Sequence, residues 1–184
     1  MSDERPVMRI GLLGFGTVGT GVVRHLRHNG ALMADRIGVR LELARVADLD
    51  ITRDRGVQLE PGLLTTDAAA VVRDPGVDVV VELIGGTAAA RQLTLAAFQA
   101  GKPVVTANKA LICQHGEELF GAAAANSVDY YYEASVAGGI PLIKAQREGL
   151  VANRIESIHA ILNGTCNYIL TRMTEDGLPF DAAL

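Results

Sequence analysis

Three glycines in the segment Gly14-Phe15-Gly16-Thr17-Val18-Gly19 constrain this chain more than any other feature. The spacing G-x-G-x-x-G is common by itself, but here it follows an apolar run, Val7 to Leu13, and precedes apolar residues at helical spacing. Strand, glycine turn and helix in this order are typical of a dinucleotide-binding unit. The first glycine permits a tight turn, the second lets the backbone approach the pyrophosphate, and the third lets helix and strand pack closely. The free N–H groups of the helix N-terminus then attract the phosphates.

The rest of the chain alternates short apolar strands with helical segments. We expect strands at Val7 to Leu13, Val39 to Ala47, Val77 to Ile84, Pro103 to Thr106, Val128 to Glu133 and Ile155 to Leu162. We expect helices from Thr17 to about Asn29, where Asn29-Gly30 stops the first, and at Asp67 to Arg73, Thr87 to Ala100, Asn108 to Ala125, Ile140 to Gly149 and Asn163 to Asp176. Such alternation predicts an α/β fold of the Rossmann type, a doubly wound parallel sheet with helices on both faces.

The 184-residue length suits one buried domain and the beginning of a second. We place the nucleotide-binding domain at residues 1 to 134, and the start of an α/β substrate and dimerisation domain at residues 135 to 184. Asp181 can cap a helix, but only three residues follow it, too few for a stable helix. The chain is therefore expected to be the N-terminal piece of a longer protein.

The composition excludes several classes of protein. A formal net charge of -4 provides no basic field for nucleic acid, and the basic stretch Arg24 to His28 is interpreted as a solvated helix face. Cys113 and Cys166 have no C-x-x-C spacing, so neither a disulfide framework nor a zinc site is expected. The first residues are polar, and the longest apolar run, Val77 to Ile84, is short and interrupted by two acidic residues. We expect a cytoplasmic protein without membrane or nucleic-acid partners.

Charged residues cluster where the second strand should end. Asp48 and Asp50 stand where a carboxylate accepts hydrogen bonds from the adenine ribose and repels a 2′-phosphate, so NAD is favoured over NADP. Asp48 lies farther from the glycines than the usual spacing of about 20 residues, an excess we attribute to a polar insertion around Asn29 to Gly38. Arg53 and Arg55 could instead receive the 2′-phosphate, and a solvated loop of mixed charge is an equal alternative for them.

Two further segments follow strand ends. Small residues at Gly85-Gly86-Thr87 would let the nicotinamide half pass close to the backbone, although an ordinary strand-to-helix turn is equally consistent. Lys109, near a nicotinamide, could donate a hydrogen bond or a proton to a carbonyl oxygen that gains charge during hydride transfer; an ordinary surface lysine is the alternative. Glu133 could orient a lysine, coordinate a cation or cap a helix. No histidine has partners that suggest catalysis.

With four of its segments the chain resembles homoserine dehydrogenases, which interconvert L-homoserine and L-aspartate 4-semialdehyde with NAD(P)(H) in the biosynthesis of threonine and methionine. The matching segments are, in family order, Ile10 to Gly19, Val104 to Leu111, Glu133 to Pro141 and Leu162 to Leu170. The first is common to many dehydrogenases, whereas the other three together are specific to this family.

The resemblance implies roles for particular residues. Phe15, Thr17 and Val18 would line the cofactor site. Thr87 and Lys109 would lie near the nicotinamide, and Lys109 would assist catalysis.

The resemblance also implies a monovalent cation site, with sodium as the expected ion, formed mainly by backbone carbonyls of Glu133, Val136, Gly138 and Ile140. The intact protein is expected to be a homo-oligomer. Family segments with the substrate-binding acidic residues and a second lysine would lie beyond Leu184, so this chain alone is expected to be inactive.

Two other functions fit the glycine turn. One is a non-catalytic dinucleotide-binding or redox-sensing module, and the other is a different Rossmann oxidoreductase that acts on amino-acid-like or sugar substrates. The segments Thr106 to Lys109 and Asn163 to Tyr168 favour the homoserine dehydrogenase type over both.

Overall fold

The computed structural model describes residues 5 to 160 and 163 to 184. The chain divides into two compact units, one up to Tyr132 and one from Glu133 to Leu184. The boundary expected from the sequence lay two residues later, after residue 134.

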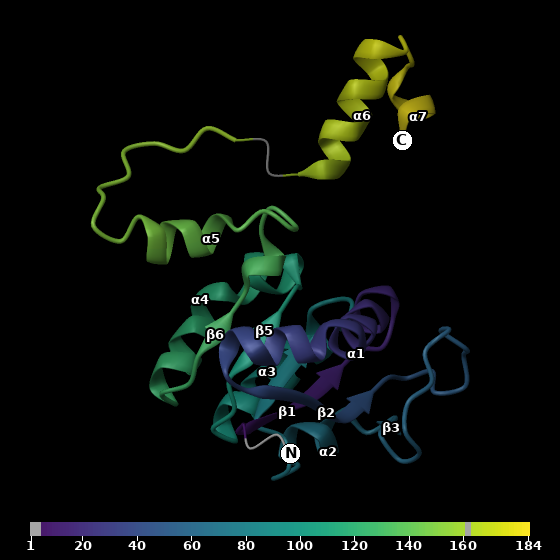
Figure 1. The fold of residues 1–184 in the computed structure, drawn as a ribbon. Coiled ribbons are helices and arrows are strands. Elements are labelled where there is room, and N and C mark those ends of the chain that lie inside the picture. The colour runs from purple at the N-terminus through teal and green to yellow at the C-terminus, as the bar shows by residue number, and fades with distance from the viewer. Residues whose placement is uncertain (1–4, 161–162) are drawn as a thin grey trace. The chain divides into compact units, whose positions relative to one another are not determined.

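The first unit is built on six parallel strands in the order β3-β2-β1-β4-β5-β6 (Figure 1). The strands are β1 (Val7–Leu13), β2 (Arg40–Ala47), β3 (Leu64–Thr65), β4 (Val79–Glu82), β5 (Val104–Thr106) and β6 (Tyr130–Tyr131). The chain winds outward in one direction from β1 to β3 and in the other from β4 to β6, so the order reverses between β1 and β4, the point where such sheets bind ligands. The predicted doubly wound parallel sheet is confirmed.

Helices cover both faces of this sheet. They are α1 (Thr17–Ile37), α2 (Ala68–Arg73), α3 (Ala88–Gln99) and α4 (Lys109–Ala125). Adjacent leucines of β1 point to opposite faces: Leu13 packs in the core shared with α2, α3 and α4, and Leu12 packs with Phe15 and Val23 on the α1 side. The sheet is thus buried on both sides, and its edges and loops remain for function.

Helix α1 is longer than expected. It continues past Asn29 to Ile37, so the predicted stop at Asn29-Gly30 is wrong. One interior glycine costs a helix only about 1 kcal/mol, and Ala31 to Ala34 are good helix formers. The helix ends at Gly38, whose φ of 72° permits the left-handed cap. The residues interpreted as a polar insertion are therefore the second half of α1.

The lengths of the strands are set by hydrogen bonding to the neighbouring strands rather than by the lengths of the apolar runs. Strand β4 is shorter than the expected Val77 to Ile84, and β6 is shorter than the expected Val128 to Glu133. Strand β6 pairs through only Tyr130 and Tyr131 with β5, because the partner strand is itself short. Strand β3 was not predicted, since two residues carry no periodic signal.

The second unit contains helices in its described part: a 3₁₀ turn, Glu133–Ser135, then α5 (Leu142–Lys144), which continues as a π-helical turn (Ala145–Gly149), then α6 (Gly164–Glu175) and α7 (Phe180–Ala183). The expected strand Ile155 to Leu162 is not formed by residues 155 to 160, and residues 161 and 162 lie outside the described residues. A strand needs a hydrogen-bonded partner, and the described part of this unit offers none.

The last turn of the chain also differs from expectation. Asp181 does not cap a helix, because α7 begins at Phe180 and the N–H of Ala183 donates to the carbonyl of Pro179. None of the described helices is long and apolar enough to cross a membrane.

Candidate functional site

The glycine turn joins β1 to α1 at the carboxyl edge of the sheet. Gly14 has a φ of 95°, and a Cβ there would lie 2.6 Å from the carbonyl oxygen of Leu83. A Cβ on Gly19 would overlap the carbonyl oxygen of Gly14. Gly16 is the N-cap of α1, so no side chain caps the helix, and there is open space around this residue. The first N–H groups of α1 therefore lack a side-chain acceptor, which leaves them to an anion such as a pyrophosphate.

Asp48, directly after β2, is hydrogen-bonded to the glycine turn. Its Oδ2 accepts a hydrogen bond from the backbone N–H of Phe15 at 2.6 Å. Its Oδ1 accepts from the N–H of Asp50 at 2.9 Å and from Nη2 of Arg55 at 3.0 Å. The side chains of Asp48 and Arg55 are only 17% and 9% exposed, so the pair is largely sheltered from water. Three donors thus surround the carboxylate that we expect to bind the ribose.

The two arginines of the following loop differ in their surroundings. The guanidinium of Arg55 lies 5.1 Å from the ring centroid of Phe15 and donates to the carbonyl of Asp50, so a solvated position is wrong for Arg55. Arg53 is exposed, and its side chain has no hydrogen-bond or ion-pair partner within residues 5 to 160 and 163 to 184. Within this loop, the guanidinium of Arg53 is therefore available to bind a phosphate.

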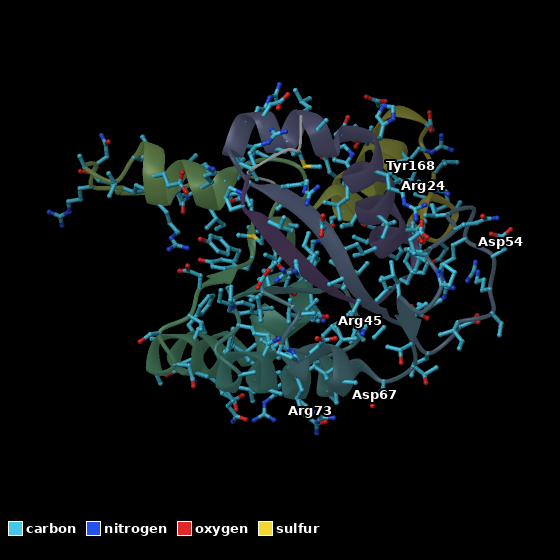
Figure 2. The ribbon with its side chains drawn as sticks, turned by 60° about the horizontal axis from the view of Figure 1, so that its bottom comes forward. Arg24, Arg45, Asp54, Asp67, Arg73 and Tyr168 are labelled. Carbon is cyan, nitrogen blue, oxygen red and sulfur yellow. The ribbon has the colours of Figure 1, made fainter. Side chains whose placement is uncertain are left out.

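An arginine pocket of about 510 Å³ lies between α1 and the loop after β2. Figure 2 shows Arg24 on α1 and Asp54 on that loop, two of the residues that line it. Nη2 of Arg24 donates to the carbonyl of Arg55, which holds the loop against the helix. The complete lining is Gly16, Thr17, Thr20, Arg24, Asp48, Asp50, Arg53, Asp54 and Arg55. The three arginines beside a helix N-terminus suit a phosphate group, whereas the three aspartates of the same lining oppose one.

An apolar pocket of about 300 Å³ lies at the same edge of the sheet. It is lined by Gly14, Gly16, Ala47, Asp48, Leu49, Thr66, Ala68, Leu83, Ile84, Gly85, Ala89 and Leu93. Asp48 and Gly16 border both this pocket and the arginine pocket. A flat apolar group such as an adenine fits such a lining, with its sugar beside Asp48.

A lysine pocket of about 290 Å³ lies at the ends of β4 and β5. It is lined by Val18, Leu83, Ile84, Gly85, Ala107, Asn108 and Lys109. Lys109 is exposed at the first position of α4, where Asn108 caps the helix by accepting from the N–H of Leu111 at 3.0 Å. The structure thus brings Lys109 beside Val18 and Gly85, whereas Gly86 and Thr87 follow in the chain without lining the pocket.

In the second unit Glu133 acts as a helix cap. Its two carboxylate oxygens accept from the N–H groups of Ile143 at 3.0 Å and Lys144 at 2.7 Å. Among the residues that the structure describes, no three His, Cys, Asp or Glu side chains are grouped to hold a metal ion. The fit to a monovalent cation is partial, because the Glu133 carboxylate already has two donors and the backbone carbonyls remain as ligands.

The positive φ angles of Ala137 (56°) and Gly138 (61°) turn the backbone sharply in this segment. Val136 and Gly138 lie in this turn, and the carbonyl of Ile140 accepts from the N–H of Leu142 at 2.8 Å.

Sequence reasoning missed Arg24, which was assigned to a solvated face, and Glu82, a carboxylate within a run of valines. Glu82 is fully buried at the end of β4. Burial raises the pKa of Glu82 above its ordinary value, while the hydrogen bonds from Thr106 and Ile84 act in the opposite direction. An acidic residue inside an otherwise apolar predicted strand was the available signal.

A sheet of this order, with a glycine turn, an open helix N-terminus and pockets on both sides of the turn, defines a Rossmann-type dinucleotide-binding domain. A family model described as the NAD-binding domain of homoserine dehydrogenase matches residues 14–133, and a homoserine dehydrogenase model matches residues 141–184. The chain belongs to the homoserine dehydrogenase family, which confirms the resemblance found in the sequence, and its first unit carries the domain for a nicotinamide dinucleotide.

Individual relatives agree. The chain is 48% identical over 176 residues to a homoserine dehydrogenase of Corynebacterium glutamicum and 42% identical over 177 residues to that of Bacillus subtilis, matches that cover 95% and 96% of this chain. A crystal structure of a homoserine dehydrogenase from Thiobacillus denitrificans superposes with a TM-score of 0.90 at 47% identity, over 98% of this chain and 42% of that one. The chain spans 39% and 41% of the length of the first two relatives.

Proposed function

We propose that this chain supplies the cofactor-binding part, with Lys109, of an oxidoreductase that interconverts L-homoserine and L-aspartate 4-semialdehyde with NAD(P)(H) in the biosynthesis of threonine and methionine. The observation that carries this proposal is the lysine pocket, in which Lys109 lies beside Val18 of the glycine turn and Gly85. A cation is thereby held where the turn would deliver the nicotinamide.

The pockets suggest how the chain holds its cofactor. The open N-terminus of α1 after Gly16 receives the pyrophosphate, and the apolar pocket receives the adenine. The nicotinamide half then lies toward the lysine pocket, and the bound cofactor supplies or accepts a hydride. Lys109 donates a hydrogen bond or a proton to the substrate oxygen, which gains negative charge when a carbonyl is reduced.

Asp48 and Arg53 together set the choice between NAD and NADP. We infer that NAD is favoured, because a 2′-phosphate on a ribose beside Asp48 meets a carboxylate. The carboxylate is partly neutralised by Arg55 at 3.0 Å, which limits this repulsion. Arg53, without a side-chain partner in the described part of the chain, is the residue that makes NADP acceptable.

The segment from Glu133 to Ile140 is proposed to bind a monovalent cation, sodium in particular, through the carbonyls of Val136 and Gly138. The backbone turn at Ala137 and Gly138 supports this proposal. Glu133 contributes indirectly, by capping α5 next to the segment.

The test of the function is homoserine-dependent formation of NAD(P)H by the purified protein that carries this sequence. Tight NADH binding without homoserine turnover would favour the dinucleotide-binding or redox-sensing module, and turnover of another hydroxy compound would favour a different oxidoreductase. We propose that the 184 residues by themselves do not sustain the reaction, since the relatives are more than twice as long. Homo-oligomeric assembly and a cytoplasmic location stay predictions, to be checked by size-exclusion chromatography and cell fractionation.

A further inference from the structure

Glu82 is a fully buried carboxyl group at the centre of the sheet, where β4 pairs with both β1 and β5. Its Oε2 accepts from the hydroxyl of Thr106, its partner on β5, at 2.6 Å. Its Oε1 accepts from the N–H of Ile84 at 2.7 Å. A carboxyl group at such a place is costly unless its oxygens have donors, and an apolar residue would serve packing alone.

These two hydrogen bonds belong to a closed ring of four. The hydroxyl oxygen of Thr106 also accepts from the N–H of Asn108 at 3.0 Å. Nδ2 of Asn108 donates to the carbonyl of Ile84 at 3.1 Å, which returns the ring to the loop where it began. The same amide donates to the carbonyl of Gly86 at 2.7 Å. The hydrogen bonds of Asn108 thus form a bridge between the loop after β4 and the loop after β5, and Glu82 lies beneath this bridge.

The bridge joins the two walls of the lysine pocket. One wall is the loop of Ile84 and Gly85, and the other is Asn108 and Lys109. Asn108 is also the N-cap of α4, so its position fixes the start of the helix that carries Lys109. We propose that Glu82 is a positioning residue, which holds Lys109 at a set distance from the nicotinamide through Thr106 and Asn108. This inference rests on the proposed function.

The test compares two ligands on the 184-residue chain. In the proposed function NADH contacts both walls of the lysine pocket. ADP-ribose lacks the nicotinamide and uses the glycine turn and the apolar pocket, which shares the loop of Ile84 and Gly85 but not the wall of Asn108 and Lys109. In Glu82→Gln, which leaves a single acceptor, and in Thr106→Val, which removes the hydroxyl, the Kd for NADH should rise about tenfold, as expected for a broken buried hydrogen bond. The Kd for ADP-ribose should change less than about twofold. Nicotinamide fluorescence and calorimetry give the two constants.

Matched variants separate positioning from general stability. Thr106→Ser keeps the hydroxyl and should bind NADH as tightly as the unmodified chain does. Thr94 is also fully buried, and its hydroxyl has no partner in the described part of the chain, so Thr94→Val should leave both ligands unaffected. If Thr106→Val does not fold, Asn108→Ser takes its place, because serine keeps the helix cap and removes the two Nδ2 donors.

Three results would overturn the inference. Equal weakening of NADH and ADP-ribose would show that Glu82 only supports the fold. Unchanged NADH binding in folded Glu82→Gln and Thr106→Val would show that the ring is dispensable, while the proposed function stands. An unmodified chain that binds neither ligand would remove the proposed function and this inference with it.

Discussion

The carboxylate of Asp48 accepts a hydrogen bond from the backbone N–H of Phe15 at 2.6 Å, across 33 positions of sequence. The residue expected to bind the ribose therefore also holds the glycine turn. Asp48→Ala leaves the Phe15 N–H without its acceptor and Arg55 without its partner, and should lower the free energy of unfolding by about 1 to 3 kcal/mol. Urea unfolding measures this. Asp50→Ala, which changes an exposed neighbour bonded mainly within its own loop, is the control and should have little effect. An equal loss of unfolding free energy in both variants would show that Asp48 does not stabilise the glycine turn.

Arg53 gives a prediction about cofactor choice. The unmodified chain should bind NADH more tightly than NADPH, and Arg53→Ala should weaken NADPH a further 10-fold to 100-fold, roughly the value of a hydrogen bond to a charged group. NADH affinity should be unchanged. Arg27→Ala is the control, since Arg27 is exposed on α1 and does not line the arginine pocket. Tighter binding of NADPH by the unmodified chain would show that the arginines, rather than Asp48, dominate the pocket.

Glu82 predicts a pH dependence of stability. Burial raises the pKa of Glu82 above its ordinary value of 4.5, so the folded state holds this proton more tightly than the unfolded state does. Stability from this group is therefore complete below pH 4.5 and is lost as the pH rises through the raised pKa. Tyr130 faces the same site, and the pKa of its hydroxyl is raised by burial and by the charge of Glu82, which keeps Tyr130 neutral throughout this window.

Urea unfolding from about pH 4 to about pH 8 checks this in the unmodified chain and in Glu82→Gln, which cannot titrate. The unmodified chain should lose stability relative to the variant as the pH rises. A difference that stays constant over the whole range would show that the pKa of Glu82 is not raised.

Lys109→Ala should reduce homoserine oxidation by the protein that carries this sequence about 10²-fold to 10⁴-fold, the usual contribution of a general acid or base. The Kd for NADH should rise less than in Glu82→Gln, because Lys109→Ala leaves both loops that form the lysine pocket in place. Lys144→Ala is the matched control, as its side chain is 66% exposed and pairs only with Glu148 at 3.6 Å in the described structure. Similar rates in the two variants would remove Lys109 from the chemistry.

The cation proposal predicts a specific stabilisation. Sodium chloride should raise the melting temperature of the chain above that in tetramethylammonium chloride at equal ionic strength, because backbone carbonyls bind a small hard cation and exclude a bulky one. Gly138→Ala strains a residue with a φ of 61° and should abolish the difference, whereas Gly21→Ala, in open space within α1, should preserve it. Identical melting curves in both salts would contradict a site in this segment.

Local sequence signals predicted local structure well. The glycine turn formed at the expected residues, and Asp67 caps α2 by accepting from the N–H of Ala70 at 2.8 Å, as its position before a helical run indicates. The end of α1 was mispredicted because Asn29-Gly30 is a stop signal only when no stronger helix former follows. Such errors concern element lengths, which neighbouring elements decide.

Contacts between distant residues could not be predicted in the same way. The expected charge cluster around Asp48 exists, but nothing in the spacing shows that Asp48 reaches Phe15 or that Arg55 folds back on both. Glu82 and Thr106 are neighbours only because β4 and β5 pair in this register. A partner found across a parallel ladder depends on the register, which a single sequence does not specify.

All six strands run parallel, so the loops that follow them lie at the carboxyl edge of the sheet. The two hydrophobic cores cover the faces of the sheet. The loop after β2 carries Asp48, Arg53 and Arg55, and Asn108 bridges the loops after β4 and β5 above Glu82. In the proposed function, different loops of this edge therefore serve the adenosine end and the reactive end of a dinucleotide, and the loop of Ile84 and Gly85 borders the pockets for both.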